Sequence, residues 1–205
     1  MRNFIHFNWV VTLRIYYSHN KVLFPHCGIT VPVTNKWLAN KFKPGDKVIV
    51  YPVKRFMDYV RLHNVGVLAE VLKVELLNKQ YVVSFKGVSR ARVDKRHSFW
   101  TCSYTVIDEK AHINAEITEK LRKKAQELIF LINVDESDKL IHLLNFISDG
   151  VQLSDFIANY FILDYNERVA LLNNTDVTSR INTILQLLSL LIDNIQHKRR
   201  NESSG

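Results

Sequence analysis

The sequence predicts an α+β protein in which a small β-barrel precedes an all-α helical bundle. In the first half, β-branched and aromatic residues alternate with polar ones, as in half-buried strands. In the second half, apolar residues recur three and four positions apart, as in amphipathic helices. The composition changes at about Asp108. We therefore expect a barrel subdomain over residues 1–107, a bundle subdomain over 108–197 and a polar basic tail over 198–205.

Composition narrows the class of protein. A chain of 205 residues forms one large domain or two small ones, and 47% apolar with 23% charged residues is ordinary for a soluble globular protein. There is no run of 18 apolar residues, so no membrane span is expected. Cys27 and Cys102 lie far apart without a CxxC motif, which favours a reducing compartment over a disulfide framework or a zinc site. We therefore expect a cytoplasmic protein.

The chain is basic, with a formal net charge of +8 from 28 basic and 20 acidic residues. Such an excess attracts anionic partners, for example nucleic acid or acidic protein surfaces. The other interpretation, which we favour, is a solubilising surface, because the charge is moderate and part of it lies in the basic tail.

The first half is expected to contain about six strands. Residues 77–80 read as a hairpin loop, and Gly87 breaks the following strand at a bulge. Pro25 and Pro32 argue that the strand between them is an edge or a bend. A short helix is expected over 35–42, followed by a Lys-Pro-Gly-Asp turn. Short turns between strands indicate a closed or nearly closed barrel. The expected strands cover residues 7–17, 28–33, 47–53, 65–76, 81–93 and 96–107.

The second half is expected to be helical. Helices are predicted over residues 108–133 and 138–148, with Ser137 as the cap of the second and Gly150 as its stop. Asp164 with Glu167 has the spacing of a capping box, and Thr175 or Asp176 can cap the last, long helix. That helix carries one apolar seam: Val177, Ile181, Ile184, Leu188, Leu191 and Ile195.

Three motifs together resemble the N-terminal domain of Lon, the ATP-dependent protease. The most specific is Gly-Val-Leu-Ala-Glu-Val at residues 66–71, followed by Gly-x-x-Arg-x-Arg-Val at 87–93. The second is Val-Leu-Phe-Pro at 22–25, and the third is Asp-Val-x-x-Arg at 176–180 within the short, short and long order of helices. The resemblance covers most of residues 20–196. Two segments depart from it: residues 33–64 are divergent, and residues 7–17 precede the usual start of the family.

The resemblance implies a PUA-like β-barrel followed by a helical bundle that binds polypeptide substrates or partner proteins, a Lon-type protease among them. Lon proteases continue into an ATPase and a peptidase. The sequence has no GxxxxGK[ST] phosphate-binding loop, so we expect no enzyme activity and no cofactor. No metal site is expected either, because the spacing of His19, His26 and Cys27 fits no common one. His97 and Cys102 lie five apart in one predicted strand, on opposite faces, so they form no catalytic pair.

Basic residues interleaved with aromatic ones supply the candidate binding residues. We expect the loop around residues 55–62 and the junction of barrel and bundle to hold a polypeptide. The alternative is an RNA-binding barrel, since aromatic side chains stack on bases while arginines neutralise phosphates. Simple strand alternation, with aromatics inward and arginines outward, produces the same pattern. Any exposed part of the last helix is free to pair with a second copy as a homodimer. The candidate residues are Arg55, Phe56, Tyr59, Arg61, Arg90 and Arg92.

Overall fold

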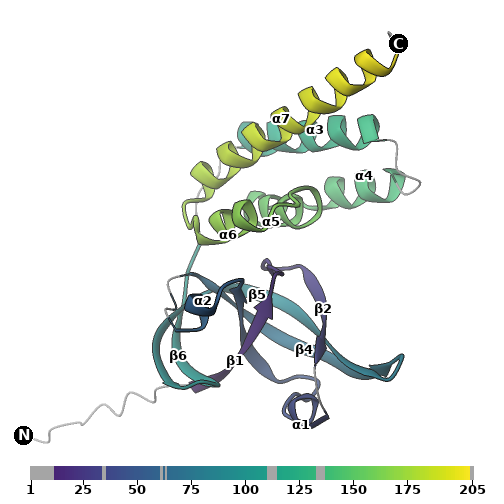
Figure 1. Cartoon of the computed structure of the whole chain (residues 1–205). Helices are drawn as coiled ribbons and strands as arrows, with labels where there is room; N and C mark the ends of the chain where they lie inside the picture. The colour runs from purple at the N-terminus through teal and green to yellow at the C-terminus, as the bar shows by residue number, and fades with distance from the viewer. Residues whose placement is uncertain are drawn as a thin grey trace, which may run out of the picture.

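The computed structural model describes residues 12–33, 36–60, 62, 64–109, 115–132 and 137–203. A barrel of strands is followed by a stack of helices on one end of it, which confirms the predicted α+β class (Figure 1). The strands are β1 (Thr12–His19), β2 (Gly28–Val33), β3 (Lys47–Val53), β4 (Gly66–Leu77), β5 (Gln80–Ser98) and β6 (Thr101–Val106). The helices are α1 (Lys36–Ala39), α2 (Phe56–Val60), α3 (Ala115–Ile132), α4 (Ser137–Phe146), α5 (Gly150–Phe161), α6 (Tyr165–Asn173) and α7 (Val177–Ser203).

The barrel closes through its longest strand, β5. The strand order is β2-β5-β4-β3-β1-β6, and an additional pairing of β5 with β6 completes the ring. β5 is 19 residues long, which lets it pair with β2, β4 and β6. β1 runs parallel to β3 and antiparallel to β6. The strand expected over residues 7–17 is therefore part of the barrel wall from Thr12 onward, while residues 7–11 lie outside the described residues.

One predicted strand, over residues 96–107, is wrong because the chain reverses at Phe99 and Trp100. The turn is held by side chains. The hydroxyls of Ser98 and Thr101 lie 2.7 Å apart, and the Ser98 hydroxyl also accepts a 3.2 Å hydrogen bond from the Trp100 amide. No glycine or proline marks this reversal, so the composition gave no sign of it.

Two other strand predictions are confirmed. β2 pairs with β5 alone, as expected for a strand that carries Pro32. The hairpin between β4 and β5 has Asn78 and Lys79 at its tip, with φ of 50° and 66°. Positive φ at both central residues is the two-residue hairpin geometry whose twist matches that of paired strands.

Gly87 marks a bulge, as predicted, and also a close approach of two backbones. Ala69 pairs with Gly87 while Leu68 pairs with Ser89, which leaves Val88 without a partner on β4. A Cβ atom on Gly87 would lie 2.3 Å from the carbonyl oxygen of Phe24. Only glycine therefore fits here without moving the segment that contains Phe24.

The predicted helices are present, with corrections to their ends. Asp108 and Glu109, expected in the first helix, are not helical. Ser137, the predicted cap of the second, is the first residue of α4, which ends at Phe146.

Gly150 does not end a helix; it is the buried first residue of α5, and Asp149 precedes it as the N-cap. The Asp149 carboxylate accepts a 2.9 Å hydrogen bond from the amide of Val151. Glycine is common just after the end of a helix, which is why Gly150 was expected to end one. Here Asp149 before it caps the start of the next helix, so Gly150 begins α5 instead.

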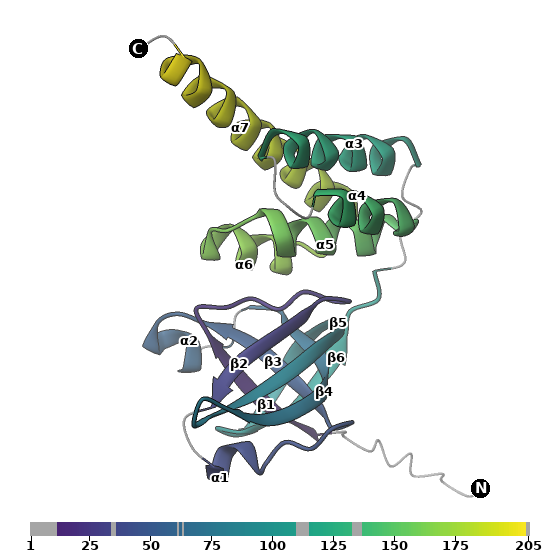
Figure 2. The same ribbon diagram turned by 90° about the vertical axis from the view of Figure 1, so that its right-hand side faces the viewer.

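Aspartates cap the two last helices. Asp164 accepts hydrogen bonds of 2.8 and 2.9 Å from the amides of Asn166 and Glu167, which confirms the predicted cap of α6. Asp176 accepts one of 3.0 Å from Ser179 and caps α7. α7 continues to Ser203, so residues expected in a separate tail extend the helix, and its C-terminal part projects beyond α3 (Figure 2). Within the described residues, no helix has the length and hydropathy required to cross a bilayer.

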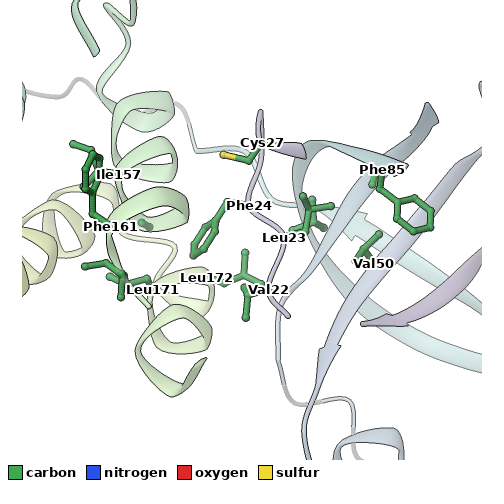
Figure 3. Packing of buried hydrophobic residues seen from close by; sticks show 14 of the residues in the cluster. Val22, Leu23, Phe24, Cys27, Val50, Phe85, Ile157, Phe161, Leu171 and Leu172 are labelled. Carbon is green, nitrogen blue, oxygen red and sulfur yellow. The ribbon is translucent and has the colours of Figure 1, made fainter. Parts of the chain in front are cut away.

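One apolar cluster runs from the barrel into the bundle. The segment between β1 and β2 joins the two parts: Phe24 points toward the helices that carry Phe161 and Leu172, and Leu23 points toward the barrel (Figure 3). Leu23 and Phe24 are both buried. A second, smaller cluster around Ile49 lies within the barrel alone. The division at residues 107 and 108 remains a prediction, and across it the two parts share a core.

Candidate functional site

The junction between barrel and bundle is held by a buried ion pair. Arg90 on β5 forms a two-pronged pair with Asp155 on α5, with nitrogen to oxygen distances of 2.9 and 2.6 Å. Both side chains have no exposed surface. Arg90 also donates to Glu109 at 2.7 Å and to the carbonyl of Leu172 at 3.0 Å. Burial alone would lower the pKa of Arg90, but the carboxylates of Asp155 and Glu109 outweigh it and raise that pKa.

A second arginine extends this network into α7. Arg180 is fully buried and donates to the other oxygen of Glu109 at 2.7 Å and to the carbonyl of Asn174 at 2.7 Å. Its Nε donates to the hydroxyl of Ser154 at 3.2 Å. Burial and the neighbouring charge of Arg90 lower the pKa of Arg180. Two guanidinium groups and two carboxylates thus fix strand β5, helix α5 and helix α7 relative to one another.

Next to this junction, α2 presents apolar side chains to solvent. Phe56 is 79% exposed, and Met57 and Val60 are also exposed. The helix is anchored by Asp58, which accepts 2.8 Å hydrogen bonds from the amides of Lys54 and Arg55. Slight burial opposes these two donors, yet they hold the pKa of Asp58 below its ordinary value. The anchored turn thus holds three apolar side chains in solvent next to one another, which makes it a candidate docking surface.

Two hollows share Tyr165 in their lining, and we call the pair of them the junction groove. The first has a volume of about 390 Å³ and separates the α2 turn from α6. The second has a volume of about 360 Å³ and lies between the segment after β1 and the end of α5. The first is lined by Lys54, Arg55, Asp58, Tyr165, Val169 and Asn173. The second is lined by Lys21, Val22, Tyr160, Leu163, Tyr165 and Arg168.

The walls of the groove are tied together by direct hydrogen bonds. Asn173 on α6 donates to the side chain of Asn64 at 3.0 Å and accepts from the amide of Val65 at 2.6 Å. The amide of Asn64 in turn donates to the hydroxyl of Tyr51 at 2.7 Å. The ammonium of Lys54 lies 5.3 Å from the centre of the Tyr165 ring. The groove is thus a preformed feature, with one wall from the barrel and one from the bundle.

Tyr165 lines both hollows, but its hydroxyl is buried away from their surface. Among the described residues, its buried hydroxyl has no hydrogen-bond partner. Burial raises the pKa of Tyr165 to about 12, with a smaller contribution from Asp58. The hydroxyl therefore keeps its proton at neutral pH.

Some of the binding residues predicted from the sequence lie at the junction groove, and others do not. Arg55 lines the junction groove, and Phe56 and Tyr59 belong to α2 beside it. Arg90 is inside the molecule and has no surface to offer a partner. Arg92 is exposed on β5, opposite Thr105, and Arg61 lies outside the described residues.

Sequence reasoning missed the bundle side of the groove. Leu163 is 86% exposed and Tyr160 is also largely exposed, although both belong to stretches that looked like core helix. The pattern contained one usable sign, because Leu163 and Asp164 stand at a break between two helices, where an apolar side chain has no helix face to join. A larger hollow of about 870 Å³ is lined by residues up to Glu109, where the described part of the chain is interrupted. We therefore assign no site to it. The described residues contain no group of metal-binding side chains.

Comparisons with known proteins agree with this architecture. The family model of the ATP-dependent protease La (LON) substrate-binding domain matches residues 12–189. The N-terminal domain of Mycobacterium avium complex Lon protease is similar in structure, with a TM-score of 0.71 at 16% identity over 87% of this chain and 98% of that one. A Lon N-terminal domain protein from Xanthomonas campestris has a TM-score of 0.56 at 16% identity, covering 86% of this chain and 98% of its own. A search of curated proteins found no match.

The matched region begins at the first residue of β1 and ends within α7. It therefore includes the first strand and the divergent segment 33–64, which the sequence motifs alone left unplaced. The two solved structures share the fold of barrel and helical bundle at low identity. The chain belongs to the family of the Lon protease substrate-binding domain.

Proposed function

We propose that this protein binds extended polypeptide segments in the junction groove, as substrates or as partner proteins, without catalysing a reaction on them. The observation that carries the proposal is the exposed apolar surface of α2 beside a preformed groove. Apolar side chains of a partner would pack on Phe56 and Leu163, and the partner backbone would form hydrogen bonds with exposed polar side chains of the lining, such as Asn166. The family itself is described by substrate binding, which supports the same reading.

The charges of the groove indicate which segments it prefers. Lys21, Lys54 and Arg55 line it, whereas Asp58 is the acidic side chain among the lining residues and is occupied by two backbone amides. An acidic segment with apolar residues would meet complementary charge at the walls and apolar contacts at the ends. A Lon-type protease, or the clients of one, is the partner class that we propose.

Absence of catalysis is part of the proposal. Burial raises the pKa of Cys102 to about 11 and that of Cys27 to about 12, so neither thiol is a ready nucleophile at neutral pH. Two buried free cysteines also fit the reducing cytosol in which we place the protein. Incubation with ATP and with an unfolded protein should release neither phosphate nor peptide fragments, and release of either would contradict this part of the proposal.

The binding test uses a permanently unfolded probe, fluorescein-labelled reduced and carboxymethylated lactalbumin, followed by fluorescence anisotropy. Phe56→Ser should weaken binding by about 5- to 30-fold, because removing an exposed aromatic anchor costs about 1–2 kcal/mol. The matched control is Phe130→Ser, since Phe130 on α3 is 69% exposed but lies outside the groove. Equal weakening by the two variants, or no binding by the unaltered protein, would remove the groove as the site.

A further inference from the structure

A further hollow, lined partly by aromatic side chains, lies at the end of the barrel away from the helices. It has a volume of about 280 Å³, and two tryptophans, Trp37 and Trp100, line it together with Phe42 and Leu38. Trp37 belongs to α1, which lies at the end of the barrel away from the helices (Figures 1 and 2). Trp37 is 60% exposed and Trp100 is 41% exposed. We call this hollow the tryptophan pocket; its size suits one flat ring system.

A strip of aromatic side chains leads from this pocket along the barrel. Trp100 and Phe99 meet edge to face with ring centres 4.8 Å apart. Phe99 and Tyr59 are stacked nearly parallel, at 10° and 6.3 Å. Arg96 donates to the carbonyl of Tyr59 and so lies beside the strip. Successive rings on one surface form a platform on which several flat groups can stack in a row.

The same end of the barrel carries positive charge. Arg14 and Lys41 line the tryptophan pocket, and the Lys41 ammonium lies 4.8 Å from the centre of the Trp37 ring. Lys36 and Lys43 are exposed close by in the chain. Asp46 lies 3.6 Å from Arg14 and offsets its charge, and the described residues that line the pocket include no acid. The remaining charge is positive, so the ligand that complements it is an anion.

From these features we infer that the tryptophan pocket and the aromatic strip bind single-stranded nucleic acid, with one base held between Trp37 and Trp100. Each unit of a nucleotide chain carries a flat base, which can stack on the aromatic side chains, and a negatively charged phosphate, which the basic side chains attract. Bases stack on the indole and phenyl rings, and phosphates lie near Arg14, Lys41 and Arg96. A duplex cannot enter, because its bases are already stacked and paired. An acidic polypeptide satisfies the charges but brings no ring at each step.

The test measures anisotropy of fluorescein-labelled oligouridylate and oligothymidylate of about ten nucleotides, a length that one small barrel covers. Trp37→Ala and Trp100→Ala should each weaken binding by about tenfold, because a base stacked on an aromatic side chain contributes that much. Lys41→Glu should weaken binding and flatten its dependence on salt concentration, because one phosphate contact is lost. The controls are Phe130→Ala and Lys123→Glu, exposed residues of the bundle, and circular dichroism checks that every variant folds.

Binding of either oligonucleotide with these losses supports the inference, and the preference between them identifies RNA or DNA as the natural source. Four results would overturn it: no binding to either strand, equal binding of a duplex, tryptophan variants that behave like the controls, or displacement by polyglutamate at equal charge concentration. Because Phe56 and the junction groove are not used here, failure of this test leaves the polypeptide-binding proposal intact.

Discussion

At the scale of single residues, Arg90 was a candidate binding residue in the sequence, but in the structure it is buried and holds the fold together. Its guanidinium meets carboxylates from two other segments, Asp155 and Glu109, and all three groups lie inside the molecule. A buried charge is tolerated only where its partner and its hydrogen bonds are complete, and removal of one partner leaves the other charge unpaired.

We therefore expect Asp155→Ala to destabilise the protein by about 3–5 kcal/mol, because Arg90 would remain buried without its main counter-charge. The double variant Arg90→Met with Asp155→Leu should cost less than the single one, since no charge is left unpaired. Urea unfolding followed by circular dichroism measures both. A single variant within about 1 kcal/mol of the unaltered protein would mean that the pair is not closed in solution.

The position of Arg90 was not readable from the sequence, for two physical reasons. The bulge at Val88 shifts the alternation of β5, so counting residues from the buried Phe85 misassigns the face of every later one. Its partner Asp155 is also 65 residues away in the chain, and long-range pairing leaves no local pattern. Phe56, by contrast, could be predicted as a binding candidate, because an aromatic residue in a short segment between strands can be recognised without knowledge of any distant partner.

At the scale of elements, α7 tests the apolar seam read from the sequence. Val177, Ile181, Ile184 and Leu188 are buried as predicted, but the seam then passes through Ile192 while Leu191 is exposed. Ile195, the last residue of the predicted seam, is partly buried against the same core cluster, and Arg199 still donates to the carbonyl of Leu131 on α3.

Leu188→Ala should destabilise the protein by about 2–5 kcal/mol, because the side chain is fully buried and its loss leaves a cavity. The matched control, Leu190→Ala, should cost less than about 0.5 kcal/mol, since that leucine is 60% exposed. Thermal or urea unfolding gives both values. If the two substitutions cost the same, the register of α7 would be wrong.

The exposed face of α7 also bears on the predicted homodimer. Leu190 and Leu191 are exposed apolar residues on it, and a second copy of the helix would bury them. Light scattering should then give twice the chain mass at high concentration, and Leu190→Glu should restore the monomer. A mass of one chain at all concentrations would end this prediction.

Among the elements, those with strong local signals were predicted and those defined by tertiary contact were not. The hairpin at Asn78 and the cap at Asp164 depend on neighbouring residues only, and both could be found from the sequence. The reversal at Phe99 depends on side-chain hydrogen bonds between Ser98 and Thr101, and it could not. The candidate groove was found on its barrel side alone, because its other wall comes from α6, more than a hundred residues later in the chain.

At the scale of the whole molecule, the shared apolar cluster makes barrel and bundle depend on each other. Phe24 reaches the bundle from the barrel side (Figure 3), and the ion pair of Arg90 with Asp155 also joins the two parts. We expect both parts to unfold together in one transition, even though their secondary structures differ.

Limited proteolysis under native conditions should cut first near residue 108 or within residues 134–139, before any cut in the hairpin over residues 66–93. The two strands pair with each other along the hairpin, and β3 and β2 pair with parts of their outer sides, so they resist the local unfolding that a protease needs. The nicked fragments should stay together in gel filtration, because the cluster holds both. Early cuts inside the hairpin, or separation of the fragments, would contradict a single shared core.

Gly87 is one position at which the barrel and the segment leading to the bundle depend on each other. The amide of Gly87 donates to Cys27 and its carbonyl accepts from His26, so the strand and the Phe24 segment are bound face to face at the width of two backbones. Gly87→Ala would place a methyl group where the Phe24 carbonyl is and act as a wedge. We expect the wedge to raise hydrogen exchange at the His26 amide and to change the spacing of the groove walls at the same time. The missing methyl group at Gly87 thus allows β5 to lie against the segment that carries Phe24 into the bundle, so that one position inside the molecule couples the two parts.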